Sequence, residues 1–238
     1  AKYIVLWGSN INATRIPDAH FAWEARYNGA KVVCISPDYN CSAIHSDLYM
    51  QIAPGSDAVL ALAVARHILD NKLHDIPYVK EQTDLGFLVR KDNGRFVRAS
   101  DLVAGGKEDQ FYIWDTATNS AKPVPGCTGS SEKTLTLGTL DPALEGNWSI
   151  TGVDGKSVAV TTVLGLLRET LTDSQYSLEQ AAQRCHLPVN DIRLFAEEFA
   201  RTKPAMIIHG AGTNHWYHND LLNRSMILLA ALTGNVGK

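Results

Sequence analysis

Three short runs of consecutive apolar residues constrain the fold of this chain more than any other feature of its sequence. They are KYIVLWG at 2–8, KVVCIS at 31–36 and AMIIH at 205–209. Such an uninterrupted run is typical of a strand buried on both faces, and strands of this kind occur mainly in parallel sheets covered by helices. Helical segments alternate with these runs, so the sequence predicts an α/β fold with a doubly wound, mostly parallel, Rossmann-like sheet.

The helical segments carry signals for where they begin and end. Pro17 suits the first turn of a helix that Gly29 would end. Asp57 is a plausible N-cap of the next long helix, and Ser177 starts a capping-box pattern. A later segment is amphipathic and has a stripe of apolar residues on one face, namely Ile192, Phe195 and Phe199.

The middle of the chain breaks this pattern. Between residues 77 and 160, Gly, Pro, Asn and Asp separate short segments, which predicts an inserted subdomain of β-hairpins and loops. The segment FYIWDTATNSAKPV at 111–124 is the clearest hairpin. Residues 1–76 and 161–238 would then form the two parts of the α/β domain. The chain starts inside a strand without Met and stops at the glycine-rich LTGNVGK, so we expect a piece of a longer polypeptide.

Composition and charge exclude several classes of function. The 238 residues are 45% hydrophobic and 20% charged, as in ordinary globular proteins. The net charge of -3 lacks the excess of basic residues that is typical of nucleic-acid-binding proteins. The longest apolar run, SVAVTTVLGLL, is too short and too polar for a bilayer crossing of about 20 residues, so we expect no direct membrane insertion. No C-x-x-C pair occurs among Cys34, Cys41, Cys127 and Cys185, which argues against a zinc ribbon or iron–sulfur cluster within this segment.

Ligands of open α/β sheets bind beyond the carboxyl ends of the strands, and polar loops follow the predicted strands here. In WGSNINAT, at 7–14, Gly8 permits close approach to the backbone, and the polar side chains can contact phosphate or a polar ring. In SPDYN, at 36–40, Asp38 is well placed for ribose hydroxyls. In GSD, at 55–57, the Asp57 carboxylate can accept two hydrogen bonds from a guanine edge. Each loop also has a purely structural interpretation, as a polar turn or a helix cap.

A fourth loop, HGAGTNHWYH at 209–218, contains three histidines. Their spacing matches no zinc pattern, and no G-K-[ST] follows to form a Walker-type phosphate loop. Gly210 and Gly212 suggest close approach by a flat ligand, with Asn214 and His215 as donors and acceptors around it. The neighbouring aromatic residues, Trp216 and Tyr217, are expected to pack.

Longer stretches of the chain resemble the molybdopterin oxidoreductases of the dimethyl sulfoxide reductase family. The similarity is to the branch of respiratory nitrate, selenate, chlorate and perchlorate reductases, dimethyl sulfide dehydrogenase and ethylbenzene dehydrogenase. It is carried by WGSNINATRIPDAHFAWEARYNGAKVVCISPDYN, SDLYMQIAPGSDAVLALA, YVKEQTDLGFLVRKDNGRFVRASDL, DPALEG and GAGTNHWYHNDLLNRSMILLAALTGNVGK. Agreement is weaker between about residues 105 and 174.

The resemblance implies a Mo-bis(molybdopterin guanine dinucleotide) cofactor, of which this segment would hold one dinucleotide. The first loop would line the pyrophosphate and nucleotide, the second and third would contact the guanosine end, and Ala211 and His215 would face the pterin. Matched position by position, the implied cofactor-binding residues are Trp7, Gly8, Ser9, Asn10, Ile11, Asn12, Ala13, Thr14, Ser36, Pro37, Asp38, Tyr39, Asn40, Gly55, Ser56, Asp57, Gly210, Ala211, Gly212, Asn214 and His215.

The resemblance also implies parts that this segment lacks. The molybdenum ligand and an N-terminal iron–sulfur cluster would lie outside it, so no catalytic or metal-binding residue is assigned within it. The full enzyme would carry out oxygen-atom transfer or hydroxylation on a small-molecule or oxyanion substrate and pass electrons to or from an iron–sulfur subunit. It would be periplasmic, with the cytoplasmic face of the membrane as the alternative. Two rival interpretations are a nucleotide-binding module without redox chemistry, like the central domain of thiamine-dependent enzymes, and a scaffold domain with empty loops.

Overall fold

The computed structural model describes residues 1–125 and 137–237. Its contacts divide the chain into two compact units, residues 1–75 with 171–238, and residues 76–170. Each unit has a hydrophobic core of its own. The predicted insertion was placed at 77–160, and its second boundary falls inside a strand that pairs with two others, which is why the observed unit extends further.

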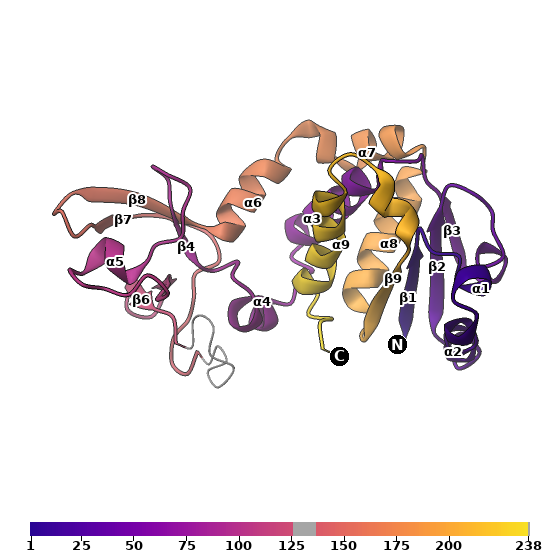
Figure 1. The fold of residues 1–238 in the computed structure, drawn as a ribbon, viewed down its shortest axis with the longest axis horizontal. Coiled ribbons are helices and arrows are strands. Elements are labelled where there is room, and N and C mark those ends of the chain that lie inside the picture. Colours follow the sequence, from indigo (N-terminus) through magenta and orange to yellow (C-terminus); the bar gives the residue numbers. More distant parts are fainter. Residues whose placement is uncertain (126–136, 238) are drawn as a thin grey trace. The chain divides into compact units, whose positions relative to one another are not determined.

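The first unit is built on a sheet of four parallel strands, β1 (Tyr3–Trp7), β2 (Lys31–Ser36), β3 (Leu48–Gln51) and β9 (Ala205–His209). The strand order is β3-β2-β1-β9, so β2 and β3 extend the sheet on one side of β1 and β9 extends it on the other. The order of addition therefore reverses next to β1 (Figure 1). The predicted α/β fold with a doubly wound parallel sheet is confirmed.

Both faces of this sheet are covered, as the uninterrupted apolar runs predict. On one face, Ile4 and Leu6 of β1 join a cluster with Ala19 and Ala22 of α2 (Ile16–Tyr27). On the other face, the β1 aromatics contact α8 (Val189–Arg201), with the Trp7 and Phe195 rings meeting edge to face at 6.0 Å. Figure 1 shows α2 and α8 on opposite sides of the strands. Alternate β1 side chains thus anchor two different helix layers.

The other helices of the first unit complete these layers. They are α1 (Ile11–Thr14), α3 (Asp57–Asp70), α7 (Leu178–Cys185) and α9 (Asn219–Leu232), with 3-10 turns η1 (Ala43–His45), η2 (Ser174–Tyr176) and η3 (Ala211–His215). Helix α3 packs against α7, α8 and α9. It is buried along much of its length, so it fixes the start of the helix at the carboxyl edge of the sheet.

Several predicted helix ends are confirmed. Pro17 lies in the first turn of α2, and Gly29 follows its end with φ +92°. The Ser177 hydroxyl accepts a hydrogen bond from the Gln180 backbone N–H at 3.2 Å. The N-cap role expected for Asp57 is wrong: it is the first residue of α3 and Ser56 is the cap residue. The reason is that the Asp57 carboxylate bonds the Trp7 indole instead.

The second unit contains α4 (Ile76–Gln82), β4 (Leu88–Arg90), α5 (Ala99–Leu102), β5 (Tyr112–Asp115), β6 (Ser120–Pro123), β7 (Asn147–Thr151), β8 (Ser157–Thr162) and α6 (Val163–Leu171). An antiparallel sheet has the order β4-β8-β7, and β5 pairs with β6 in the predicted hairpin. Trp114 and Trp148 stack at 4.9 Å in its core. Residues 126–136 of the expected hairpin region, including Cys127, lie outside the described residues.

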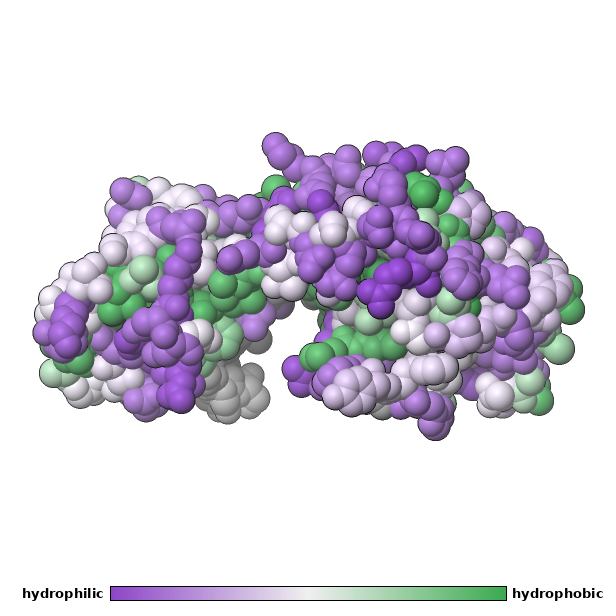
Figure 2. Space-filling model, turned by 90° about the horizontal axis from the view of Figure 1, so that it is seen from above, coloured by the Kyte–Doolittle hydropathy of each residue, from purple (hydrophilic) through white to green (hydrophobic). Residues whose placement is uncertain are grey.

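The helices and the surface bear on the expectation that no segment inserts into a membrane. None of the helices in residues 1–125 and 137–237 combines the length and apolar character that a bilayer crossing requires. In the space-filling view, hydrophilic residues predominate on the face shown, with smaller hydrophobic areas between them (Figure 2).

Candidate functional site

The four polar loops meet around one cavity of about 240 Å³ in the first unit. The cavity lies where β1, β2 and β9 end, next to the reversal in strand order, which is the usual ligand position in open α/β sheets. Its lining residues are Gly8, Asn10, Ser36, Pro37, Asp38, Asn40, Ile52, Pro54, Asp57, Gly212, Thr213 and Trp216. Eight of these twelve belong to the predicted set of cofactor contacts, so most of the lining was named from the sequence.

The first two loops are joined by a buried hydroxyl that the sequence analysis did not single out. The Ser42 hydroxyl donates to Asn10 Oδ1 at 3.0 Å and accepts from the Asn12 backbone N–H at 3.2 Å. Ser42 is itself held by its backbone N–H, which donates to Asn40 Oδ1 at 3.0 Å. This chain of hydrogen bonds places Asn10 and Asn40 on the same wall of the cavity before any ligand arrives.

The second loop presents a carboxylate that is already oriented. The Ser36 hydroxyl donates to Asp38 Oδ1 at 2.7 Å, and Asn40 Nδ2 donates to the same hydroxyl at 3.1 Å. Tyr39, in contrast, is largely exposed and packs edge to face on Tyr49 at 5.1 Å. Asp38 therefore has one oxygen engaged within the loop, while the residue lines the cavity.

The third loop delivers a nearly buried carboxylate. Asp57 is 5% exposed, and its Oδ1 accepts a hydrogen bond from Trp7 Nε1 at 2.8 Å. Ser56 occupies the cap position of α3, but its hydroxyl donates to the Ala53 carbonyl at 2.7 Å and makes no capping hydrogen bond to the helix. The Trp7 indole engages Oδ1 and leaves Oδ2 of Asp57 without an indole contact.

Burial sets the charge state of this carboxyl group. Desolvation raises the pKa of Asp57, and the Trp7 hydrogen bond, nearby backbone N–H groups and the His209 charge oppose that rise. Desolvation in turn lowers the pKa of His209, and the Asp57 charge opposes it. The charges of Asp57 and His209 thus influence each other, and of the two residues Asp57 is the one that lines the cavity.

The fourth loop packs tightly onto the first. The Gly210 backbone N–H donates to the Trp7 carbonyl at 2.9 Å, and its Cα lies against Gly8 so closely that a Cβ there would clash. Thr213, in η3, is 3% exposed; its hydroxyl donates to the Gly210 carbonyl at 3.0 Å and contacts the His209 ring. The fourth loop is therefore a folded turn of fixed shape.

The charge of the cavity narrows the ligand chemistry. Two carboxylates line it, Asp38 and Asp57, together with amide, hydroxyl and backbone groups. Within the described part of the chain, no Lys or Arg lines it. Carboxylates accept N–H and O–H donors, so the site favours a polar ring with hydroxyl groups over a free phosphate.

The remaining predicted contact residues do not line the cavity. The side chains of Trp7, Ser9 and Ile11 are buried, so a ligand could meet these residues mainly through their backbone. The other predicted residues outside the lining are Asn12, Ala13, Thr14, Tyr39, Gly55, Ser56, Gly210, Ala211, Asn214 and His215. Asn214 Oδ1 accepts from Asn223 Nδ2 at 2.8 Å, which ties η3 to α9.

The aromatic pair of the fourth loop corrects one expectation. Tyr217 was expected to pack and is instead 90% exposed. Trp216 covers Gly55, where an added Cβ would meet the indole at 3.1 Å, and it also lines the cavity. Trp216 and Thr213 are lining residues that the sequence analysis missed. The aromatic character of Trp216, beside a glycine-rich turn, was the available signal.

The metal interpretation of the three histidines finds no support in the geometry. Within residues 1–125 and 137–237, no group of three or more His, Cys, Asp or Glu side chains is arranged to hold a metal ion. His209 is engaged with Thr213, while His215 and His218 are exposed.

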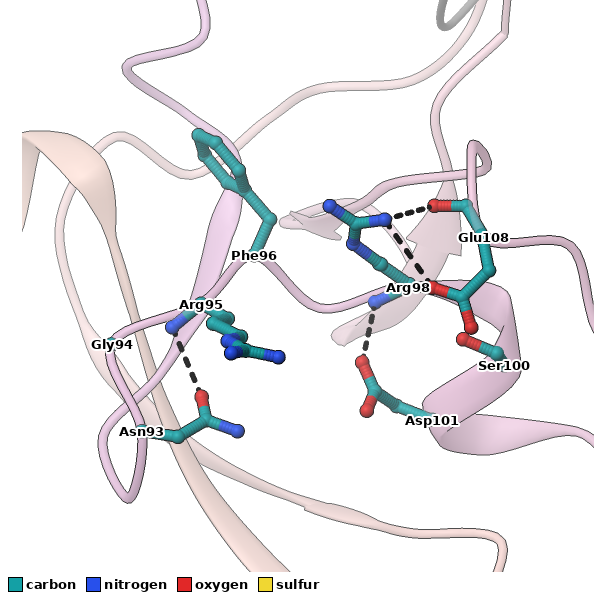
Figure 3. A pocket seen from close by; sticks show the side chains of 8 residues that line it. All are labelled: Asn93, Gly94, Arg95, Phe96, Arg98, Ser100, Asp101 and Glu108. Carbon is teal, nitrogen blue, oxygen red and sulfur yellow. Dashed lines mark hydrogen bonds and ion pairs between the residues drawn. The ribbon is translucent and has the colours of Figure 1, made fainter.

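A larger cavity, of about 540 Å³, lies in the second unit and differs in character. It is lined by Asn93, Gly94, Arg95, Phe96, Arg98, Ser100, Asp101 and Glu108 (Figure 3). Figure 3 shows Arg98 turned toward Glu108, and the two form an ion pair at 3.3 Å. Arg90 pairs with Asp101 at 2.5 Å. Because its charges largely neutralise one another, and no predicted contact lies there, the cavity at the strand ends remains the candidate site.

Comparisons with known proteins identify relatives of the whole chain. The family described as molybdopterin oxidoreductase matches residues 1–238. The perchlorate reductase subunit alpha of Dechloromonas aromatica (strain RCB) is 44% identical over 257 residues, covering 100% of this chain and 28% of that protein. The dimethylsulfide dehydrogenase subunit alpha of Rhodovulum sulfidophilum is 43% identical over 238 residues, covering 100% of this chain and 25% of that protein.

A solved structure shares the fold at low sequence identity. The acetylene hydratase from Pelobacter acetylenicus superimposes with a TM-score of 0.60 and 16% identity, covering 99% of this chain and 22% of that one. The chain spans about a quarter of the length of the curated relatives it matches.

Proposed function

Because this chain belongs to the molybdopterin oxidoreductase family, we propose that it is the domain of a catalytic subunit that holds one dinucleotide of a Mo-bis(molybdopterin guanine dinucleotide) cofactor. Membership of the family implies a molybdenum–pterin cofactor and places the chain within an oxidoreductase catalytic subunit. The finer statement, that this domain binds the guanine end, rests on the cavity at the strand ends.

The size and the polar groups of the cavity fit the nucleoside end of such a cofactor. Its volume of about 240 Å³ is below the roughly 300–1,000 Å³ of pockets that enclose whole drug-sized ligands, so it suits one part of a dinucleotide. Asp57 offers the N–H donors of guanine a carboxylate oxygen that Trp7 does not engage, and Asp38 is placed for ribose hydroxyls. This pairing of two oriented carboxylates in one cavity is the observation that carries the proposal.

The rest of the dinucleotide would rely on neutral groups. With no cationic side chain among the described lining residues, the pyrophosphate would be held by backbone N–H groups and by amides such as Asn10. Gly212 leaves open space above the Gly8 carbonyl, whose oxygen lies 3.7 Å from the position of an added Cβ. A flat group can approach the backbone there, as we propose for the pterin side, with Ala211 and His215 at its edge.

The bound cofactor would supply the redox chemistry of the reaction, either oxygen-atom transfer or hydroxylation. The residues of this domain would bind, orient and shield the cofactor, and the pre-formed network around Ser42 would reduce its freedom of movement. In the whole protein we propose an oxyanion or other small-molecule substrate, an iron–sulfur cluster N-terminal to this segment, and an iron–sulfur partner subunit. We propose a periplasmic location for it.

The rival functions make different demands on the same cavity. A scaffold domain needs no cavity at the strand ends, and the observed one is lined by polar groups and open to a ligand. A nucleotide-binding module without redox chemistry would use the same strand ends but has no need of a guanine contact at Asp57. Chemical analysis of the bound ligand therefore separates these functions.

The decisive experiment measures molybdenum and acid-released guanine nucleotide per polypeptide in the full-length protein from its native source. We expect about two guanine nucleotides per molybdenum. A folded protein that carries neither would refute the proposal.

Substitution of Asp57 tests the guanine contact directly. Asp57→Ala leaves ligand N–H donors without an acceptor, at a cost of roughly 1–3 kcal/mol per group, or about 5- to 150-fold in affinity. Asp18→Ala is the matched control, because the exposed Asp18 carboxylate pairs with Arg15 and does not line the cavity. Equal nucleotide content in the two variants would contradict the contact.

A further inference from the structure

We propose that Trp7 is a positioning residue for the nucleoside site, because its indole N–H fixes one oxygen of Asp57 and leaves the other for the ligand. The inference rests on the proposed function and assigns Trp7 a role different from the direct cofactor contact that the sequence resemblance implies. Trp7 would act through Asp57 and would not touch the cofactor with its side chain.

The geometry of Trp7 suits a fixed donor. It is the last residue of β1, it is 0% exposed, and its ring meets Phe195 edge to face with an interplanar angle of 74°. The surrounding sheet and α8 therefore hold the indole in one orientation. The hydrogen bond from Nε1 to Asp57 Oδ1, at 2.8 Å, connects the end of β1 to the start of α3 across 50 positions of sequence.

An indole differs from other possible partners of a buried carboxylate. It can donate but cannot accept, so the oxygen that it engages is fixed as an acceptor. It carries no charge, so it orients the carboxylate without neutralising it. The other oxygen, Oδ2, is not engaged by the indole, and the residue lines the cavity.

This arrangement matters because the ionised form of Asp57 is the form that accepts N–H donors. The titratable groups that face it are His209 on β9 and Cys185 on α7, and Asp38 lines the same cavity. Burial raises the pKa of Asp57, and the Trp7 hydrogen bond heads the effects that lower it. Without the indole donor, the carboxyl would take up a proton at higher pH and present an O–H toward the ligand donors.

Trp7→Phe in the full-length, cofactor-loaded protein tests the inference, because it removes the donor and keeps an aromatic ring. The matched control is Tyr3→Phe on the same strand, which removes a hydroxyl that donates to Glu198 at 3.1 Å, outside the cavity lining. Guanine nucleotide retained after incubation and desalting is measured across a series from neutral to acid pH. Thermal unfolding of each variant is recorded in parallel.

The expected result is that Trp7→Phe loses its nucleotide at a higher pH than the wild type, while Tyr3→Phe follows the wild type. Loss that is uniform at every pH, with an unchanged midpoint, would show a purely structural role and overturn the inference. So would an unchanged profile. A wild-type protein without guanine nucleotide would instead refute the proposed function and leave no site to position.

A second variant keeps the inference testable if Trp7→Phe does not fold. Asp57→Asn keeps an oxygen that can accept from the Trp7 indole but cannot titrate. In this variant the acid-dependent step of nucleotide loss should disappear, and Trp7→Phe added to it should not move the midpoint. Persistence of the same acid-dependent step in Asp57→Asn would overturn the inference, because another group would then control retention.

Discussion

Replacing Gly210 by alanine should separate the fourth loop from the first. Gly210 has ordinary extended backbone angles, φ −101° and ψ 160°, so the substitution introduces no conformational strain of its own. The difficulty is space. An added Cβ would lie 1.8 Å from the Gly8 carbonyl oxygen and 2.7 Å from the Ser9 Cα. An ordinary contact begins at 3.4 Å, so the two backbones must separate by about 1.6 Å, the difference between 3.4 and 1.8 Å.

The energetic cost follows from that displacement. Overpacking of this kind costs typically about 1–3 kcal/mol. The same movement breaks the hydrogen bond from the Gly210 N–H to the Trp7 carbonyl, at 2.9 Å, which contributes about 0.5–1.5 kcal/mol. The free energy of unfolding should therefore fall by about 1.5–4.5 kcal/mol. Nucleotide content should fall as well, because Gly212 and Thr213 move with the loop.

Gly212→Ala provides the matched control within the same turn. Its added Cβ would meet the Gly8 carbonyl oxygen at 3.7 Å, which is an ordinary contact. Chemical unfolding of the two full-length variants gives the difference in stability, and acid-released guanine nucleotide reports the state of the site. The reasoning is refuted if Gly210→Ala is as stable as Gly212→Ala, because the close approach of the two loops would then not exist.

Three further predictions follow from the buried groups around the cavity. Burial raises the pKa of Asp57 in the folded state, so its contribution to stability is present at low pH and is lost as pH rises through that pKa. Asp57→Asn should therefore raise the melting temperature of the cofactor-free protein at neutral pH and leave it unchanged in acid. A higher melting temperature at every pH would contradict this. Ser42→Ala removes the hydroxyl that holds Asn10 and should lower the free energy of unfolding by roughly 1–3 kcal/mol in urea titrations, together with nucleotide content; unchanged values would show that the network is dispensable. Phe195→Ala removes a fully buried ring beside Trp7 and should cost about 3–5 kcal/mol by the same titration; a loss below 1 kcal/mol, on the order of a surface change, would contradict its role in the core.

The parallel sheet could be predicted from sequence because its signal is local. Strands β1 and β2 are apolar runs of five and six residues, and burial on both faces leaves no alternation to interpret. The apolar run of β9 is only partly buried, because β9 lies at the edge of the sheet. The meeting of the four loops followed from geometry alone, since the carboxyl ends of parallel strands lie at one edge. For this reason the edge of the sheet at which the loops meet could be predicted without knowledge of the side chains that line the cavity.

Other features depended on partners far away in sequence. The direction of the Asp57 carboxylate is decided by Trp7, and the sequence near Asp57 indicates only a helix start. Nothing near Ser42 in the sequence marks it, because its hydrogen-bond partners, Asn10 and Asn12, lie about 30 positions away. In the second unit, the apolar run SVAVTTVLGLL proved to be the strand β8 followed directly by α6, a change that a continuous apolar pattern does not mark.

The pairing of β1 with β9 has a consequence for how the protein is made. Tyr3 lies opposite Ala205, a separation of 202 positions. Strand β1 therefore cannot pair with β9 until nearly the whole segment has been synthesised. Closing so long a loop is entropically costly and slows folding. A nascent chain that ends before β9 would have β1, β2 and β3 but would lack Thr213 and Trp216 of the cavity wall. Cofactor loading is therefore expected to follow synthesis of this segment, and the period before it leaves an open sheet edge for a chaperone to protect.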